Sequence, residues 1–323
     1  MNNLDDIITP TFNWLKEKNK VAIATVISTW GSAPRQVGGQ MAINETGEII
    51  GSVSGGCVEN SVITEALDSL KDKKHRIKDY GITNDLAWEV GLACGGNLKI
   101  LINPLEDNDK IIFKTKKMMQ KREWVIIKAN CKTGKREIIS KLDQEQNKTS
   151  YLDYNEDIFY HIIDPKPRLF IIGGVHLSQA LSSLANICEY EVIIIDPREY
   201  FANKKRFPND LIINEWPDVA LKNYSFNFSD NIVTLTHDPK IDDLALKIAL
   251  NSKAGYIGSL GSRKTHASRI ERLKSEGYNL EQISKIHAPI GLNISSKTPQ
   301  EIALSIMAEI TQVRRSFWKI IRS

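Results

Sequence analysis

The feature that most constrains the fold is a regular alternation of apolar strands and amphipathic helices that begins at Arg168. RLFIIGG (168–174) is a continuous apolar run, and a helical pattern and a second apolar run, EVIIIDPRE (191–199), follow it. A strand–helix–strand unit of about thirty residues pairs its strands in parallel with a right-handed crossover. Later strand patterns at 211–216, 231–238 and 254–262 continue the alternation. The pattern predicts a Rossmann-like, doubly wound parallel sheet.

The first turn of this predicted sheet partly matches a dinucleotide-binding fingerprint. Gly173 precedes a helix, and Asp196 lies 23 residues after it, where an acidic residue would meet a ribose hydroxyl. The second and third glycine positions hold Val175 and Ser178, so the backbone approaches a pyrophosphate less freely. The alternative is a sheet used for packing or dimerisation, with Asp196 capping the next turn. Contacts with a ligand are expected at the carboxyl ends of the strands, including His176.

The segment GSLGSRKTHASR (258–269) is the most polar loop of this half. Glycine, serine and basic residues precede a helix there, a composition that suits an anion near Ser262 and Arg263. The alternative reading is that Ser262 is only the N-cap of that helix.

The first half predicts a mixed α/β domain with two glycine-rich loops. A helix (2–19) leads into the strand VAIATVIST, which ends in TWGSAPRQVGGQ (29–40). Arg35 offers bidentate hydrogen bonds to phosphate or carboxylate, and the neighbouring glycines expose backbone N–H groups. The alternative is a surface arginine beside a turn. MAINETGEIIGS reads as a hairpin, so this loop and the next one are predicted to share one end of a sheet.

The second loop, GSVSGGCVENS (51–61), delivers a single cysteine, Cys57, to the expected start of a helix. A helix N-terminus attracts anions and favours a thiolate, so the turn could hold a phosphate or a soft metal. The alternative is a strand-to-helix turn in which Cys57 is a small buried hydrophobe. A similar element, GLACGG (91–96), places Cys94 before the strand NLKILINP. Zinc is not expected, because its ligands come in close pairs and each cysteine here stands alone.

Composition bounds the remaining classes of function. The 323 residues, divided near Pro165 and Pro167, predict domains at 1–164, with a small β extension, and at 165–323. A formal net charge of only +4 gives no indication of a nucleic-acid partner. Four scattered cysteines and the lack of a secretory or membrane-spanning pattern predict a cytoplasmic protein that does not associate with a membrane.

Several segments together resemble the XdhC/CoxI family of molybdenum-enzyme accessory proteins, in the family's order along nearly the whole chain. The matching segments are GSAPRQVGGQM, GSVSGGCVEN, CGGNLKILINP, RLFIIGGVHLSQAL, VIIIDPR, YIGSLGSRKTHASR and IHAPIGLNISSKTPQEIALSIMAEI. The resemblance implies a chaperone, rather than a catalyst, that binds the molybdenum cofactor (molybdopterin) and supports its sulfuration. It also implies delivery to a xanthine dehydrogenase-type molybdenum hydroxylase, with a cysteine desulfurase as a further partner. We expect a homodimer.

Carried over residue by residue, the resemblance places a cofactor site on the two loops and the Cys94 turn. A molybdopterin is a flat anionic ligand with a phosphate and a thiophilic metal, which suits an arginine, an exposed backbone and a cysteine. Cys57 would contact the molybdenum. The implied residues are Gly31, Ser32, Pro34, Arg35, Gly55, Gly56, Cys57, Glu59, Cys94 and Gly95. The alternative function is an NAD(P)-dependent oxidoreductase that uses the Rossmann-like domain.

Overall fold

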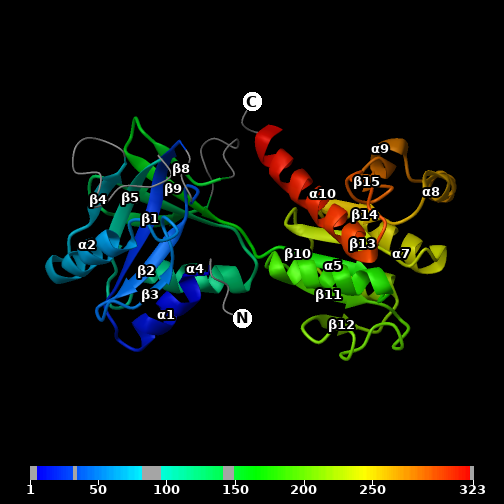
Figure 1. Cartoon of the computed structure of the whole chain (residues 1–323), viewed down its shortest axis with the longest axis horizontal. Helices are drawn as coiled ribbons and strands as arrows, with labels where there is room; N and C mark the ends of the chain where they lie inside the picture. The colour runs from blue at the N-terminus through cyan, green and yellow to red at the C-terminus, as the bar shows by residue number, and fades with distance from the viewer. Residues whose placement is uncertain (1–5, 32–34, 82–95, 141–148, 321–323) are drawn as a thin grey trace. The chain divides into compact units, whose positions relative to one another are not determined.

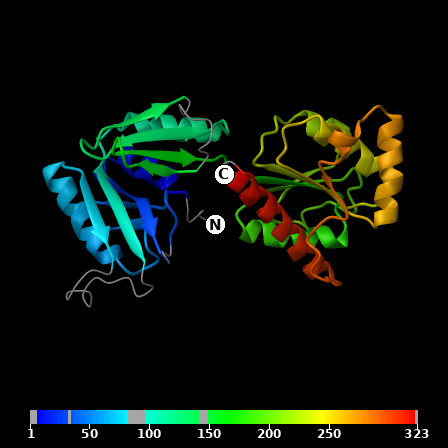
Figure 2. The ribbon, with the colours of Figure 1, turned by 90° about the horizontal axis from the view of Figure 1, so that it is seen from above.

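The protein is described by a computed structural model at residues 6–31, 35–81, 96–140 and 149–320. The chain forms two compact units that meet in sequence between Pro165 and Lys166, and Figures 1 and 2 show the ribbon of each. None of the helices in these residues is long and apolar enough to cross a membrane. The units are described separately below.

The first unit is built on a five-stranded antiparallel sheet in the order β3-β2-β1-β5-β4. The predicted hairpin is present, and the long strand β1 pairs with both β2 and β5. The strands are β1 (Val21–Trp30), β2 (Gln40–Asn44), β3 (Ile49–Gly51), β4 (Arg76–Tyr80) and β5 (Asn97–Pro104). The helices are α1 (Ile8–Lys16), α2 (Glu59–Asp72) and α4 (Lys110–Gln120).

Both faces of this sheet are covered by other elements of the unit. The first seven residues of β1 are buried, and most of them are accordingly apolar. Successive side chains of a strand point to opposite faces. Ala22 and Ala24 therefore pack in the cluster that contains α2, whereas Val21 and Ile23 pack with α1 and α4. The helices lie on either side of the sheet in Figure 1.

A second, four-stranded antiparallel sheet, in the order β7-β6-β9-β8, also belongs to this unit. Ile27 and Leu101 of the first sheet pack against its inner face. Its strands are β6 (Val125–Asn130), β7 (Arg136–Ile139), β8 (Tyr151–Asp153) and β9 (Ile158–Ile163).

Strand β4 lies in a charged segment whose basic start, KDKKHR, reads in the sequence as a solvated surface. It is an edge strand, and two of its basic residues, Arg76 and Lys78, form ion pairs with Glu65 of α2 at 3.3 and 2.5 Å. Charged side chains are common on edge strands, where they oppose pairing with other chains. A search for apolar alternation therefore misses this strand.

The second unit confirms the predicted fold class. Its six strands are parallel in the order β12-β11-β10-β13-β14-β15, which is the order of dinucleotide-binding sheets. The strands are β10 (Arg168–Ile172), β11 (Glu191–Ile195), β12 (Leu211–Ile213), β13 (Asp230–Thr234), β14 (Tyr256–Ser259) and β15 (Ile286–His287). The helices are α5 (His176–Ile187), α6 (Pro217–Lys222), α7 (Pro239–Leu250), α8 (Arg263–Ser275), α9 (Leu280–Ile283) and α10 (Pro299–Ile320).

Helices cover both faces of this sheet as well. Helices α5 and α10 pack in one core with Leu169 and Ile171, while α6 to α9 pack in the other with Phe170 and Ile172. A strand that is buried on both faces of a sheet, such as β10, needs apolar side chains on both faces and therefore reads as a continuous apolar run. The strand order reverses between β10 and β13, and in such sheets ligands bind beyond the carboxyl ends of the strands.

Candidate functional site

Two loops of the first unit, those that carry Arg35 and Cys57, leave the same end of the five-stranded sheet. At this edge β1 ends at Trp30 opposite Asn97, where β5 begins, and β4 ends at Tyr80 opposite the next residue of β5. The end of β3, Gly51, lies here too, beside the start of β2. We call this the loop edge; the loops that carry Arg35 and Cys57 start or end there. Of the predicted site residues, Ser32, Pro34, Cys94 and Gly95 lie outside the described residues.

The loop 52–58 is built around the carboxylate of Glu59. Oε1 accepts hydrogen bonds from the Ser52 hydroxyl at 2.6 Å and from the Ser54 N–H at 2.9 Å. Oε2 accepts from the Ser54 hydroxyl and, at 2.8 Å, from the Gly56 N–H. The backbone N–H groups of this loop, for which the sequence suggested an external anion, therefore donate to a carboxylate of the chain itself.

Burial and hydrogen bonding act on Glu59 in opposite directions. Its side chain is buried, and burial alone would raise the pKa of the carboxyl group. The hydrogen bonds from Ser52 and Ser54 outweigh this effect and lower the pKa to about 2. Glu59 is therefore ionised at neutral pH, and its charge compensates the partial positive charge at the start of α2.

Cys57 is exposed on this loop, which excludes the alternative that it is a buried hydrophobe. The buried side chains of Val53 and Val58 anchor the loop on either side of it. Helix α2 begins at Glu59, two residues later than the sequence suggested, so Cys57 precedes the helix. Apart from its chain neighbours, no described residue comes within 4 Å of the position that a Cβ would take at Gly56. Cys57 is thus exposed next to a glycine that no other described residue crowds, on a loop anchored by Val53 and Val58.

Arg35 joins the first glycine-rich loop to the second. Its Nε donates a hydrogen bond to the carbonyl oxygen of Ser52 at 3.1 Å, so the structure brings Arg35 to the loop that carries Cys57. Gly31 is exposed at the other end of the Arg35 loop and takes a positive φ of 72°. Gly55, with a φ of 77°, donates its N–H to the Ser52 hydroxyl.

Trp30 is a surface feature that the sequence reading overlooked. Its side chain is 77% exposed at the loop edge, directly before Gly31. An exposed indole offers a flat apolar face on which a planar ligand can stack. The signal in the sequence was an aromatic residue at the point where a β-branched strand meets a glycine-rich loop.

The described residues contain no group of three or more His, Cys, Asp or Glu side chains placed to hold a metal ion.

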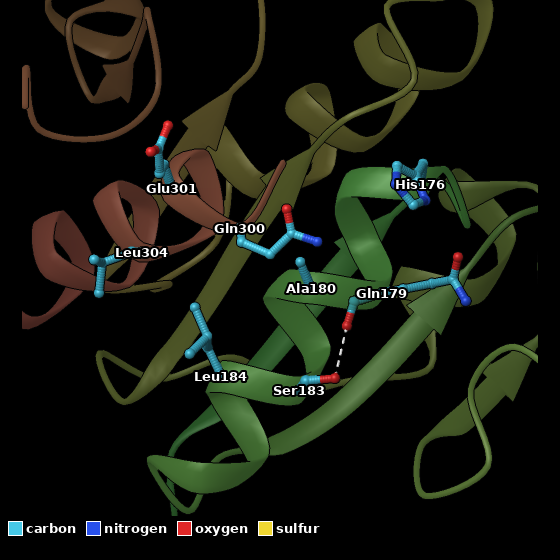
Figure 3. A pocket seen from close by; sticks show the side chains of 8 residues that line it. All are labelled: His176, Gln179, Ala180, Ser183, Leu184, Gln300, Glu301 and Leu304. Atoms are coloured by element: carbon cyan, nitrogen blue, oxygen red, sulfur yellow. Dashed lines mark hydrogen bonds between the residues drawn. The ribbon is translucent and has the colours of Figure 1, made fainter. Parts of the chain in front are cut away.

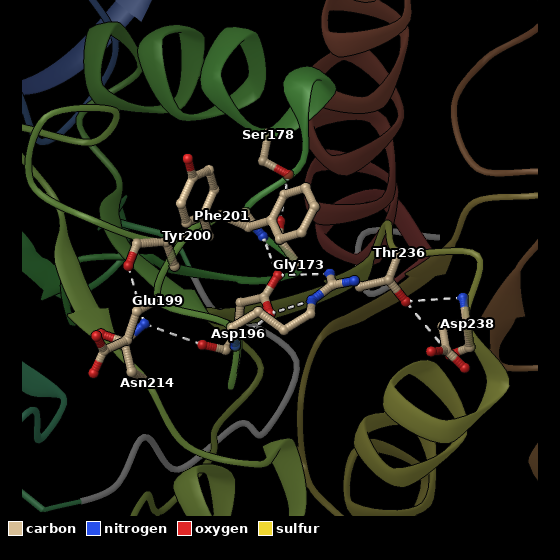
Figure 4. A network of polar contacts seen from close by, with 12 residues as sticks. Gly173, Ser178, Asp196, Glu199, Tyr200, Phe201, Asn214, Thr236 and Asp238 are labelled. Carbon is tan, nitrogen blue, oxygen red and sulfur yellow. Dashed lines mark hydrogen bonds and ion pairs between the residues drawn. The ribbon is translucent and has the colours of Figure 1, made fainter.

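In the second unit, Asp196 is fully buried at the end of β11 (Figure 4). Its Oδ2 accepts a hydrogen bond from the Gly174 N–H at 2.9 Å. The guanidinium of Arg198 binds both oxygens, each at 2.9 Å. Burial would raise the pKa of Asp196, but the hydrogen bonds from Arg198 and Gly174 lower it overall. The carboxylate that would meet a ribose hydroxyl is thus bound within the chain.

The turn at Gly173 and Gly174 is also covered by protein. A Cβ at Gly174 would lie 2.5 Å from the carbonyl oxygen of Phe201, and one at Gly173 would lie 2.4 Å from the Thr236 side chain. The guanidinium of Arg206 donates to the carbonyl oxygens of both Gly174 and Phe201. These glycines are required by close contacts inside the unit.

His176 begins α5 and lines a different feature, an open groove of about 590 Å³ between α5 and the start of α10. Figure 3 shows its side chain and those of Gln179 and Gln300 bordering this groove. Leu304, 53% exposed, contributes an apolar wall on the α10 side.

Ser262 is the N-cap of α8, as one of the two sequence readings held. Its hydroxyl accepts a hydrogen bond from the Thr265 N–H at 3.2 Å. Arg263 follows as the first residue of the helix and is exposed.

Comparison with known proteins agrees with this two-part architecture. The family model described as "XdhC and CoxI family" matches residues 14–81, and the one described as "XdhC Rossmann domain" matches residues 169–310. A relative from Bacillus subtilis (strain 168), named as a probable subunit of xanthine dehydrogenase, is 26% identical over 322 residues, covering 93% of this chain and 95% of the relative. The "Molybdenum cofactor insertion chaperone PaoD" of Escherichia coli (strain K12) is 27% identical over 304 residues, covering 90% and 83%.

A solved structure is similar along almost the whole chain. It is the crystal structure of a protein from Bacillus halodurans that is described as a xanthine dehydrogenase. The TM-score is 0.77 at 25% sequence identity, and the match covers 96% of each chain.

Proposed function

Because this chain belongs to the XdhC and CoxI family, we propose that it binds the molybdenum cofactor and delivers it to a xanthine dehydrogenase-type molybdenum hydroxylase. A relative named as a molybdenum cofactor insertion chaperone aligns with most of the chain and supports this role. The observation that carries the proposal is the exposed Cys57, held on a loop that Glu59 locks from within.

The residues of the loop edge suit the three chemical parts of such a cofactor. Cys57 offers a soft sulfur ligand to molybdenum beside the open space at Gly56. Arg35, fixed to the same loop through Ser52, supplies positive charge for the phosphate. Trp30 offers an exposed flat face to the pterin ring.

Glu59 has a supporting role in this proposal. It contacts Ser52, Ser54 and Gly56 rather than the open side of the loop, so it positions Cys57 and does not touch the ligand. The phosphate would then be bound by a guanidinium and not by the N–H groups of the 52–58 loop.

The finer parts of the proposal concern partners. We include sulfuration of the bound cofactor with a cysteine desulfurase, and a homodimeric state, on the family resemblance alone. In this proposal the cofactor-binding domain is residues 1–164, and the Rossmann-like domain is residues 165–323.

The competing function, an NAD(P)-dependent oxidoreductase, is less well supported by the second unit. Asp196 already accepts hydrogen bonds from Gly174 and Arg198, and Phe201 occupies the space above the glycine turn. Binding a dinucleotide in the usual manner would require both contacts to be exchanged.

The test is to purify the protein from a host that makes the cofactor and to measure bound pterin and molybdenum. Cys57→Ser is expected to lose most of the molybdenum. Cys188→Ser is the matched control, since Cys188 is also exposed but lies at the end of α5 in the second unit. Full retention of molybdenum by Cys57→Ser would exclude the proposed contact, and absence of pterin from the unmodified protein would refute the function itself.

A further inference from the structure

A second cavity, of about 260 Å³, lies between the N-terminal parts of α7 and α8. These helices follow β13 and β14, so the cavity is at the carboxyl end of the sheet, where parallel sheets bind ligands. The N-termini of both helices bring partial positive charge towards it. Its walls include Asp242, Asp243, Lys264, Arg269 and Arg272.

Two charged side chains in this wall are almost completely buried and incompletely bonded. Arg269 is 2% exposed, and its Nη2 donates to the Leu260 carbonyl oxygen at 3.1 Å. Its Nε and Nη1 have no hydrogen-bond partner among the described residues. Asp242 is 1% exposed; its Oδ1 accepts from the Thr236 hydroxyl at 2.7 Å, but its Oδ2 likewise has no partner there.

Unpaired buried polar groups are costly, at about 1–3 kcal/mol each and more when charged. Arg269 and Asp242 attract each other electrostatically, but each keeps atoms without a hydrogen bond to a described residue, and such a donor pair and acceptor in the wall of one cavity suit a ligand that bonds to both.

The remaining charged side chains of the cavity wall that concern the ligand are either paired with each other or exposed. Arg272 binds both oxygens of Asp243, at 2.6 and 3.1 Å, so these two side chains neutralise each other. Lys264, exposed in the first turn of α8, adds a positive charge at the rim.

We propose that this cavity binds a phosphate group that carries a proton. The guanidinium of Arg269 and the ammonium of Lys264 donate to its unprotonated oxygens, and its P–OH donates to Oδ2 of Asp242. The ligand is either inorganic phosphate or a small phosphate monoester, since both offer the same donor and acceptors. This site is separate from the loop edge, and the inference does not depend on the proposed role in molybdenum chemistry.

The Asp242 carboxylate makes the site selective. Sulfate has the same shape as phosphate but carries no proton at neutral pH, so its oxygen would face the carboxylate without a hydrogen bond.

Calorimetric titration of the full chain in phosphate- and sulfate-free buffer tests the proposal. Inorganic phosphate is expected to bind about tenfold or more tightly than sulfate at matched ionic strength, in line with the loss of one charge-assisted hydrogen bond. Ribose 5-phosphate distinguishes the two sources, since tighter binding than inorganic phosphate identifies a monoester. No phosphate binding, or equal affinity for sulfate, would overturn the proposal.

Two variants and one control complete the test. Lys264→Ala changes an exposed side chain and is expected to weaken phosphate binding about tenfold, whereas Lys274→Ala, in the last turn of the same helix, leaves it unchanged. Asp242→Asn, checked for folding by circular dichroism, is expected to bind sulfate and phosphate equally. Unaltered affinity in Lys264→Ala would contradict the assignment. Because pterin retention is measured on Cys57 variants of the first unit, failure of either proposal is seen independently of the other.

Discussion

Replacing Glu59 by glutamine is expected to loosen the loop that carries Cys57. The amide keeps one acceptor oxygen and the shape of the side chain, but its nitrogen cannot accept the hydrogen bonds that Ser54 and Gly56 now donate to Oε2. The substitution therefore removes the charge and part of the network, with little change in volume.

The magnitude follows from the pKa of Glu59, which is lowered from 4.5 to about 2. At about 1.4 kcal/mol for each pH unit between the two values, ionisation stabilises the closed loop by at most about 3 kcal/mol. Some of this is screened because the loop lies at the surface, so we expect about 2 kcal/mol, or roughly thirtyfold in the opening equilibrium. The stabilisation is complete above pH 4.5 and is lost as the pH falls towards 2, since the pKa is depressed in the folded state.

Hydrogen–deuterium exchange followed by mass spectrometry measures this opening. Peptides that cover 52–60 should exchange about thirtyfold faster in Glu59→Gln at pH 7, and the difference from the unmodified protein should shrink as the pH is lowered towards 3. Glu45→Gln, at an exposed carboxylate in the β2–β3 turn, is the control and should exchange normally. Equal exchange in the two variants, or a difference that does not change with pH, would refute the account of Glu59.

Two further predictions concern the stability of the first unit, measured by scanning calorimetry. Gly51→Ala should cost about 1–3 kcal/mol more than Gly47→Ala, because both residues have a φ near 85° but only at Gly51 would the new Cβ meet a backbone oxygen, at 2.4 Å; equal melting temperatures would refute this. His161 is buried, and burial lowers its pKa to about 4 despite a hydrogen bond with Gly38 that raises it, so its neutral form is favoured by folding. The stability that results is complete above pH 6.5 and is about 2 kcal/mol smaller at pH 5. The melting temperature of His161→Gln should therefore depend less on pH between 7 and 5 than that of the unmodified protein. An unchanged pH dependence would contradict this account.

The fold of the second unit could be predicted from the sequence because its signals are local and mutually consistent. β10 and β11 are apolar runs that need burial on both faces, and the helix between them has one apolar side. The first unit was harder, since β1 pairs with β5 some seventy residues later along the chain. No local pattern indicates such a pairing, nor the charged edge strand β4, which pairs with β5 and whose basic side chains bind Glu65 of α2.

The loop edge shows the same limit at the level of a site. The hairpin β2–β3 placed the Arg35 loop beside the Cys57 loop, as the sequence indicated, and the hydrogen bond from Arg35 to Ser52 joins them. The position of Trp30 opposite Asn97 depends on the long-range pairing of β1 with β5, which no local pattern in the sequence indicates.

Glu59, Asp196 and Asp242 show when a charged residue in a sequence indicates a ligand. Glu59 follows Gly56 by three residues and binds its N–H, and Asp196 precedes Arg198 by two and binds its guanidinium. A charge with a partner so near along the chain satisfies itself on folding, because closing a short loop costs little entropy. Asp242 and Arg269, by contrast, lie on different helices, and each keeps buried atoms without a partner among the described residues. A glycine-rich loop with an acid within three residues is accordingly a weaker prediction of an anion site than a buried arginine whose neighbours leave it unsatisfied.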